Sequence, residues 1–215
     1  MNPKNYNDIN LNSIIFNDPI YNNNDEIFES VIKYSNRDGS DDFIMHTSRL
    51  RIVKIEKHGD VTKLVVEFLL SEPKFYEVIN NIDYYTINQV VENSESWFGN
   101  KSKYETIENL FKNTVELPSK LHNFPVMTIY VLNNCKVYNK VGDLINIDEL
   151  KENNEISTEL KLKNIEFHIH KYNLVYICNK INITNYFCQV SHYLFDDSDD
   201  ITNLDDDASV GSIEF

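Results

Sequence analysis

The sequence predicts a mainly β domain with inserted helices, an α+β fold, followed by an acidic C-terminal tail. Two segments rich in strand-forming residues flank a segment whose apolar residues recur at helical spacing. The last 21 residues, "FDDSDDITNLDDDASVGSIEF", hold seven Asp, one Glu and no Lys or Arg. Because like charges repel and little apolar surface can be buried, we expect residues 195–215 to be disordered.

The chain length and composition predict one globular body. The chain has 215 residues and a hydrophobic fraction of 41%, enough to bury a core. The formal net charge is −14, of which the tail carries −8 and residues 1–194 carry −6. A mildly acidic body can still present a local basic groove, because net charge does not say where the lysines lie.

Composition also indicates source and location. No apolar run reaches the length of a membrane span, and "MNPKNYNDIN" is not a signal peptide. The three cysteines have neither metal nor disulfide spacing, which favours a reducing compartment. One Ala and three Arg against many Asn, Ile, Lys and Tyr are typical of A/T-rich codons. We expect the source to be an A/T-rich virus, protist or bacterium. We expect a location in the host-cell cytoplasm, at a viral replication compartment, or in the nucleus, rather than secretion.

The first strands are expected early in the chain. Residues 1–40 are polar and rich in Asn, and predict an irregular arm with one strand near residues 28–34. The body, residues 41–194, begins with "FIMHTSRLRIVKIEKHGDVTKLVVEFLL", which predicts two strands joined at His58-Gly59-Asp60. Gly59 suits this turn because glycine adopts positive φ without strain.

Helices are expected in the middle of the body. "SEPKFYEVINNIDYYTINQVVENSESW" has apolar residues every three or four positions, with Ser71 as N-cap and Pro73 in the first turn. A second helix is predicted over residues 104–113, with Ser102 and Glu105 in capping-box spacing.

Strand character then returns in "FPVMTIYVL", "CKVY" and "NIEFHIHKYNLVYICNKINI", the last with a tight turn at residues 171–173. Strands, then helices, then strands favour a partly open antiparallel barrel of the oligonucleotide-binding (OB) type, which uses about five strands.

No catalytic motif is present. The phosphate-loop, dinucleotide, nucleophile-elbow and zinc-protease patterns are all missing from the sequence. Glu166, His168 and His170 alternate along one strand, about 7 Å apart in succession, which is too far to hold one metal without other strands. We therefore expect a protein that is not an enzyme and has no metal and no cofactor.

Three segments interleave aromatic and basic residues: "SRLRIVKIEK", "WFGNKSKY" and "HIHKY". Binding single strands without sequence preference needs this combination, because rings stack on bases and cations follow the phosphates. The candidate nucleic-acid-binding residues are Arg49, Arg51, Lys54, Lys57, Trp97, Phe98, Lys101, Lys103, Tyr104, Lys171 and Tyr172. A structural role competes at each position, since the aromatic residues can close the core and the basic residues can form a solvated strand face.

The tail has two interpretations. It can mimic a nucleic-acid backbone or dock on basic partners, with its last residue as an apolar anchor. The candidate partner-binding residues are Asp205, Asp206, Asp207, Glu214 and Phe215. The alternative is a solubilising end whose terminal aromatic residue has no role.

This arrangement resembles the single-stranded DNA-binding proteins of bacteria and phages, which join an OB-fold body to an acidic tail ending in Phe. The match is "DDDASVGSIEF", although residues 208–213 separate the acids from the terminal aromatic residue. The resemblance implies a tail that recruits replication proteins and is displaced when DNA binds.

A second segment, "FYEVINNIDYYTINQVVENSESWFGNKSKYETIENLF", is similar to one in OB-like single-strand-binding proteins of nucleo-cytoplasmic large DNA viruses. In those proteins a helix leads to Trp-Phe-Gly, a basic loop and a short helix. Trp97, Phe98, Gly99, Lys101 and Lys103 occupy those places here.

Together these patterns favour a sequence-nonspecific single-stranded DNA-binding protein with no membrane partner. It would coat exposed strands in replication, recombination or repair. The alternatives are a structural or scaffold protein of a large DNA virus virion or viral factory, and an RNA-binding accessory factor. The sequence leaves the oligomeric state open, a homo-oligomer included.

Overall fold

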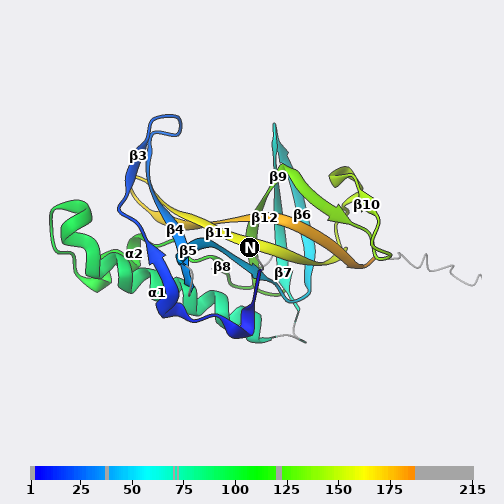
Figure 1. Ribbon diagram of the computed structural model, residues 1–215, viewed down its shortest axis with the longest axis horizontal. Coiled ribbons are helices and arrows are strands. Elements are labelled where there is room, and N and C mark those ends of the chain that lie inside the picture. The colour runs from blue at the N-terminus through cyan, green and yellow to red at the C-terminus, as the bar shows by residue number, and fades with distance from the viewer. Residues whose placement is uncertain (1–2, 37–38, 70, 72, 120–122, 187–215) are drawn as a thin grey trace, which may run out of the picture.

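The computed structural model describes residues 3–36, 39–69, 71, 73–119 and 123–186 (Figure 1). In this part of the chain the protein is mainly β with two helices, which confirms the predicted α+β class. The strands are β1 (Lys4–Asn5), β2 (Ile14–Phe16), β3 (Ile20–Asn22), β4 (Ile27–Asn36), β5 (Gly39–His46), β6 (Leu50–His58), β7 (Val61–Phe68), β8 (Val115–Glu116), β9 (Val126–Tyr138), β10 (Leu144–Ile145), β11 (Glu155–Phe167) and β12 (Tyr172–Asn185). The helices are α1 (Pro73–Phe98) and α2 (Tyr104–Leu110), with 3-10 turns η1 (Tyr6–Asp8), η2 (Leu11–Ser13) and η3 (Ile147–Glu149).

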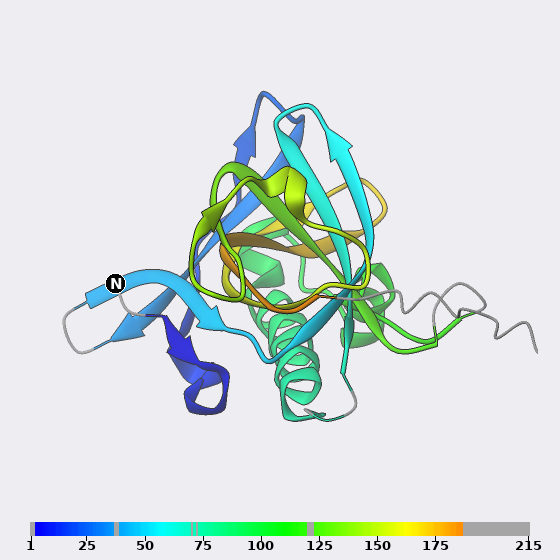
Figure 2. The same ribbon diagram turned by 90° about the vertical axis from the view of Figure 1, so that its right-hand side faces the viewer.

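Five strands close into a ring. β6 pairs with β7, β7 with β9, β9 with β12, β12 with β11, and β11 returns to β6. The β9–β12 pair is parallel and the other four pairs are antiparallel, so the ring is mostly antiparallel. The closing pair is short, with Glu155 opposite Arg51 and Ile156 opposite Leu50. Figure 2 shows the ring viewed roughly along its axis, with α1 below it.

Strand β11 joins this ring to the N-terminal strands. One edge pairs with β12 throughout, and the other edge pairs in turn with β6, β5 and β4. β4 includes the predicted strand at residues 28–34, and β3 forms a hairpin with it. The segment predicted as an irregular arm therefore contributes strands to the sheet. The hairpin lies at the end of the sheet where β11 turns into β12 (Figure 1).

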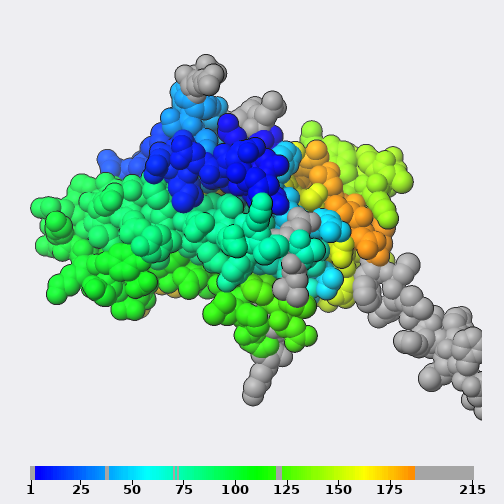
Figure 3. Space-filling model, turned by 90° about the horizontal axis from the view of Figure 1, so that it is seen from below, coloured from blue at the N-terminus to red at the C-terminus, as the bar shows by residue number. Residues whose placement is uncertain are grey.

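Helix α1 closes the underside of the core. Its buried residues Phe75, Ile79, Ile82, Ile87 and Val90 recur at helical spacing, as predicted. The N-terminal segment lies against α1 (Figure 3). The ring centroids of Tyr6 in η1 and Phe75 in α1 are 5.4 Å apart. Neither helix in the described ranges combines the length and apolar character needed to cross a membrane.

The predicted cap of α2 is wrong. The N-cap residue is Lys103, which makes no side-chain capping bond, and the helix ends at Leu110 rather than at residue 113. The backbone N–H of Ser102 instead donates to Ser94 Oγ at 3.0 Å. This bond fastens the loop between the two helices to the last turns of α1.

Two of the predicted strand boundaries shift. "CKVY" and all but the first two residues of "FPVMTIYVL" belong to one strand, β9. The turn predicted at residues 171–173 lies at residues 168–171, where His168 N–H donates to Lys171 O at 2.8 Å. Tyr172 is therefore the first residue of β12. The predicted tail, residues 195–215, lies outside the described residues.

A buried carboxyl group links α1 to the segment after α2. Asp83 is 5% exposed and accepts hydrogen bonds from the Thr114 backbone N–H at 2.8 Å and from Thr114 Oγ1 at 2.6 Å. Burial raises the pKa of Asp83 to about 7, although both bonds from Thr114 oppose the rise.

This pKa predicts how stability varies with pH. The folded chain holds the Asp83 proton up to about pH 7, whereas the unfolded chain releases it near the ordinary value of 3.8. Stability from this group is therefore lost as pH rises between those values, by up to roughly 4 kcal/mol. In urea titrations, D83N should lack this loss and be at least as stable as the natural protein at about pH 8. A D83N protein that is less stable there would contradict the assignment.

Candidate nucleic-acid interface

An apolar cleft of about 820 Å³ lies at one end of the molecule. Its walls come from the β3–β4 hairpin, the end of α1, α2 and the β11–β12 turn, all at the end of Figure 1 where α2 and β3 are labelled. We call it the aromatic cleft. Its lining includes the apolar side chains of Tyr21, Phe28, Phe98, Phe167, Ile169 and Tyr172.

A row of aromatic residues from four adjacent strands forms its floor. Tyr21 of β3 is opposite Phe28 of β4, Phe28 is opposite Phe167 of β11, and Phe167 is opposite Tyr172 of β12. Ring centroids are 5.1 Å apart for Tyr21 and Phe28, and 5.5 Å for Phe167 and Tyr172. Residues in register project from the same face, so backbone pairing alone places these rings together.

The end of α1 adds two more rings. Phe98 packs edge-on against Phe167 at 5.4 Å, and Trp97 does so at 6.1 Å. The Trp97 indole N–H donates to Asp18 Oδ1 at 3.0 Å, which holds this ring beside the N-terminal segment. Gly99 then leaves the helix with a φ of 76°, a conformation that glycine adopts without strain.

Much of this aromatic surface faces solvent. Tyr21 is 47% exposed, Phe28 50% and Phe98 42%. Exposed aromatic residues gathered in a concave site indicate a binding surface, because scattered single residues are the norm elsewhere.

Cations and anions share the rim. Lys171 lines the cleft, and Lys101 and Lys103 flank the lining residue Ser102; none of the three forms an ion pair with a described residue. Asp25 and Glu26 lie at the tip of the β3–β4 hairpin and give the rim an acidic side.

The two histidines of the β11–β12 turn also line the cleft. His168 Nε2 lies 3.5 Å from a carboxylate oxygen of Glu166. Among the described residues no group of three or more His, Cys, Asp or Glu side chains is placed to hold a metal ion.

The fold thus brings two of the three predicted segments together. Phe98 and Ser102 of "WFGNKSKY" line the cleft, with Trp97, Lys101 and Lys103 beside them in the chain, and Lys171 of "HIHKY" lines it as well. Tyr104, the first residue of α2, is half-buried, and its ring is 6.4 Å from that of Tyr84.

Tyr172 is part of the floor and not an open platform. It is 3% exposed, and its ring packs between Phe167 and Phe111, whose centroid is 5.0 Å away. Burial raises the pKa of Tyr172 above its ordinary value. The sequence did not show this, because Tyr172 was expected inside the turn, whereas the turn ends at Lys171 and Tyr172 is already paired in β12.

The basic residues of β6 are not at the cleft, and Figure 1 places β6 toward the opposite end of the sheet. Arg51 pairs with Glu67 at 2.9 Å and with Glu155 at 3.6 Å, and Arg49 lies 3.9 Å from Glu155.

The two lysines of this strand are paired as well. Lys54 pairs with Glu56 at 2.6 Å, and Lys57 pairs with Asp148. Each residue of the expected basic run therefore pairs with a carboxylate, from β6 itself for Lys54 and from other elements for the rest.

Sequence reasoning missed Tyr21 and Phe28. Both lie in "IYNNNDEIF", where polar residues separate two apolar pairs, a pattern typical of a hairpin. The candidate partner-binding residues Asp205, Asp206, Asp207, Glu214 and Phe215 lie outside the described residues.

No known protein-family model matches the chain, and no curated protein is significantly similar to it in sequence. Solved structures that are similar to it include the single-stranded DNA-binding protein from bacteriophage Enc34, at a TM-score of 0.45 and 8% identity over 86% of this chain and 97% of that one. Its C-terminal truncation gives a TM-score of 0.49 at 8% identity, covering 82% and 97%.

A further similar structure is gp2.5, a single-stranded DNA-binding protein encoded by bacteriophage T7, with a TM-score of 0.48 and 8% identity over 70% of this chain and 96% of that one. The likeness concerns the path of the backbone, so the ligand of this chain has to be argued from its own residues.

Proposed function

We propose that this protein binds single-stranded DNA without sequence preference, with bases stacking in the aromatic cleft. One observation carries the proposal: the fold joins two aromatic and basic segments, far apart in the sequence, at one cleft. Its rings face solvent, and its lysines form no ion pair with a described residue. In a cell it would coat exposed strands during replication, recombination or repair, at the replication compartment of a large DNA virus.

The chemistry of the cleft suits stacking on the faces of bases better than hydrogen bonding to their edges. Each stacked base contributes about 1–3 kcal/mol on an aromatic ring, and every base has a face that can stack. Tyr21, Phe28 and Phe98 supply such rings. Lys171 on the lining and the exposed Lys101 and Lys103 on either side of the lining residue Ser102 would meet phosphates. The lining is mainly apolar, which favours binding that tolerates any sequence.

We also propose that the ring is an OB-type barrel. Its strands in chain order are β6, β7, β9, β11 and β12, and the loop between the fourth and fifth is the β11–β12 turn. OB barrels contact oligonucleotides with this loop. In this chain the same turn carries Ile169 and Lys171 into the aromatic cleft.

One observation favours the scaffold alternative. Arg49 and the arginine and two lysines of β6 all pair with carboxylates, so none of these four cations stands apart from an anionic partner. A structural protein of a virion or viral factory would use the cleft for a protein partner and would not bind single strands.

Binding to a fluorescent oligo-dT of about 30 nucleotides, longer than the site of one barrel, separates the two proposals. F28A and F98A should each weaken binding by about 5- to 150-fold, the equivalent of one lost stacked base. Y84A is the matched control, because Tyr84 is an exposed aromatic residue of α1 that does not line the cleft. K101A and K103A should each lower the slope of log affinity against log salt by about 0.7. No binding at low salt would favour the scaffold.

For the tail we propose two roles, recruitment of basic replication proteins and competition with DNA. Eight acidic residues without a base can occupy lysines that phosphates would otherwise contact. A chain ending at Leu194 should therefore bind oligo-dT more tightly than the full-length chain, most clearly at low salt where charges are least screened. If the shortened and full-length chains bind oligo-dT with equal affinity at low salt, the tail does not compete with DNA.

A further inference from the structure

A second row of side chains crosses the outer face of the sheet. Glu56 of β6 is opposite Lys63 of β7, Lys63 is opposite Tyr130 of β9, Tyr130 is opposite Ile177 of β12, and Ile177 is opposite Lys161 of β11. We call these five residues the outer row. All five are partly exposed, whereas their strand neighbours that face the core, such as those at positions 64 and 129, are fully buried.

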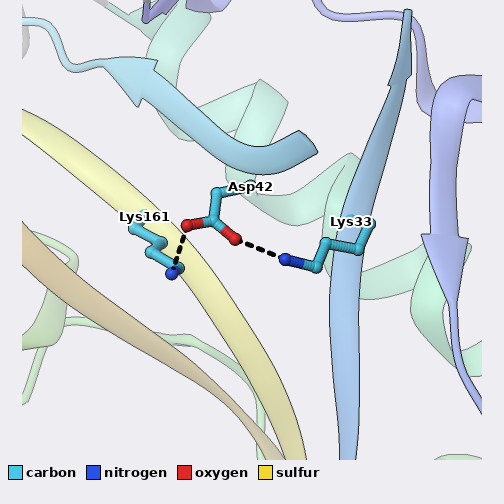
Figure 4. Close-up of polar contacts among 3 residues, drawn as sticks. All are labelled: Lys33, Asp42 and Lys161. Atoms are coloured by element: carbon cyan, nitrogen blue, oxygen red, sulfur yellow. Dashed lines mark hydrogen bonds and ion pairs between the residues drawn. The ribbon is translucent and has the colours of Figure 1, made fainter. Parts of the chain in front are cut away.

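Each end of the outer row has a carboxylate held between two lysines. The two oxygens of Asp42 lie 2.7 Å from Lys33 Nζ and 2.6 Å from Lys161 Nζ (Figure 4). At the other end, Glu56 lies 2.6 Å from Lys54 Nζ and 2.9 Å from Lys63 Nζ. Each triad carries a net charge of +1.

Both carboxylates stay ionised at physiological pH. Hydrogen bonds from Lys161 and then Lys33 hold the pKa of Asp42 below its usual range. Bonds from Lys54 and Lys63 lower the pKa of Glu56 to about 2. The four lysines therefore keep their carboxylate partners until another anion displaces them.

The fold does not depend on these ion pairs. Backbone hydrogen bonds already set the register of β4 with β5, of β5 with β11 and of β6 with β7. Partly exposed ion pairs contribute little to stability. A role in holding the strands together therefore does not explain two similar triads at the two ends of one row.

The spacing suits an extended nucleic-acid strand. Lys63 and Lys161 are separated by three strand-to-strand steps of about 4.8 Å, or roughly 14 Å. Tyr130 and Ile177 lie between them and offer one ring and one apolar side chain. Cations on both sides of an aromatic residue are the combination that single-strand binding uses.

We propose that Asp42 and Glu56 are phosphate place-holders. A DNA single strand that runs along the outer row pairs its phosphates with lysines of both triads and displaces the two carboxylates from them. This inference rests on the proposed function and adds a contact surface and its regulation. Each lysine exchanges a carboxylate for a phosphate. The new ion pairs therefore add little to the affinity for DNA, and the strand is released readily. Removing a carboxylate should therefore tighten binding.

The test uses full-length D42N and E56Q with the same oligo-dT. Each variant should bind about two- to fivefold more tightly than the natural protein, the range expected for one surface ion pair that no longer competes. E152Q is the control with the same change in net charge, because Glu152 is exposed and forms no ion pair with a described residue. K63A and K161A should each lower the salt slope by about 0.7.

The outcomes separate the inference from the function on which it rests. If the natural protein binds but D42N and E56Q behave like E152Q and the lysine variants keep the full salt slope, the triads are not place-holders and the proposed function stands. If the natural protein does not bind at low salt, the proposed function itself fails. Melting temperatures show whether a variant has lost its fold, and the lysine variants then decide the question without the carboxylate variants.

Discussion

The register of β11 is the constraint on which the rest of the structure depends. This strand closes the ring against β6, joins the N-terminal strands through β5 and β4, and pairs with β12 along its whole length. Because successive side chains point to opposite faces, a slip of one residue would turn Phe167 away from the aromatic cleft and Lys161 away from the outer row. One set of backbone hydrogen bonds therefore positions both candidate surfaces.

The two surfaces use charge differently. The aromatic cleft has exposed rings with lysines free of ion pairs with described residues, so a ligand there meets available cations and apolar surface. On the outer face the lysines share carboxylates, as in the triad where Asp42 pairs with both Lys33 and Lys161. An acidic body can in this way stay soluble and still offer positive charge to a ligand that displaces its carboxylates.

Local features of the sequence were sufficient for much of the fold. Apolar spacing predicted α1 to within two residues at its start, and Gly59, with a φ of 57°, forms the predicted turn between β6 and β7. Features that depend on distant partners were not accessible. Phe28 and Phe167 share the aromatic row only because β4 pairs with β11, and Arg51 is neutralised by Glu67 and Glu155 from two different strands. Register between strands is set by the whole core, so no short segment encodes it.

The central claim is that single-stranded DNA lies in the aromatic cleft. Ultraviolet cross-linking of full-length protein to a bromodeoxyuridine oligonucleotide, followed by mass spectrometry of the attached peptides, tests it directly. Our account predicts that the main adducts map to Tyr21, Phe28 and Phe98, which come from two separate segments of the chain. Adducts confined to peptides outside the cleft, or no adducts at low salt, would contradict it.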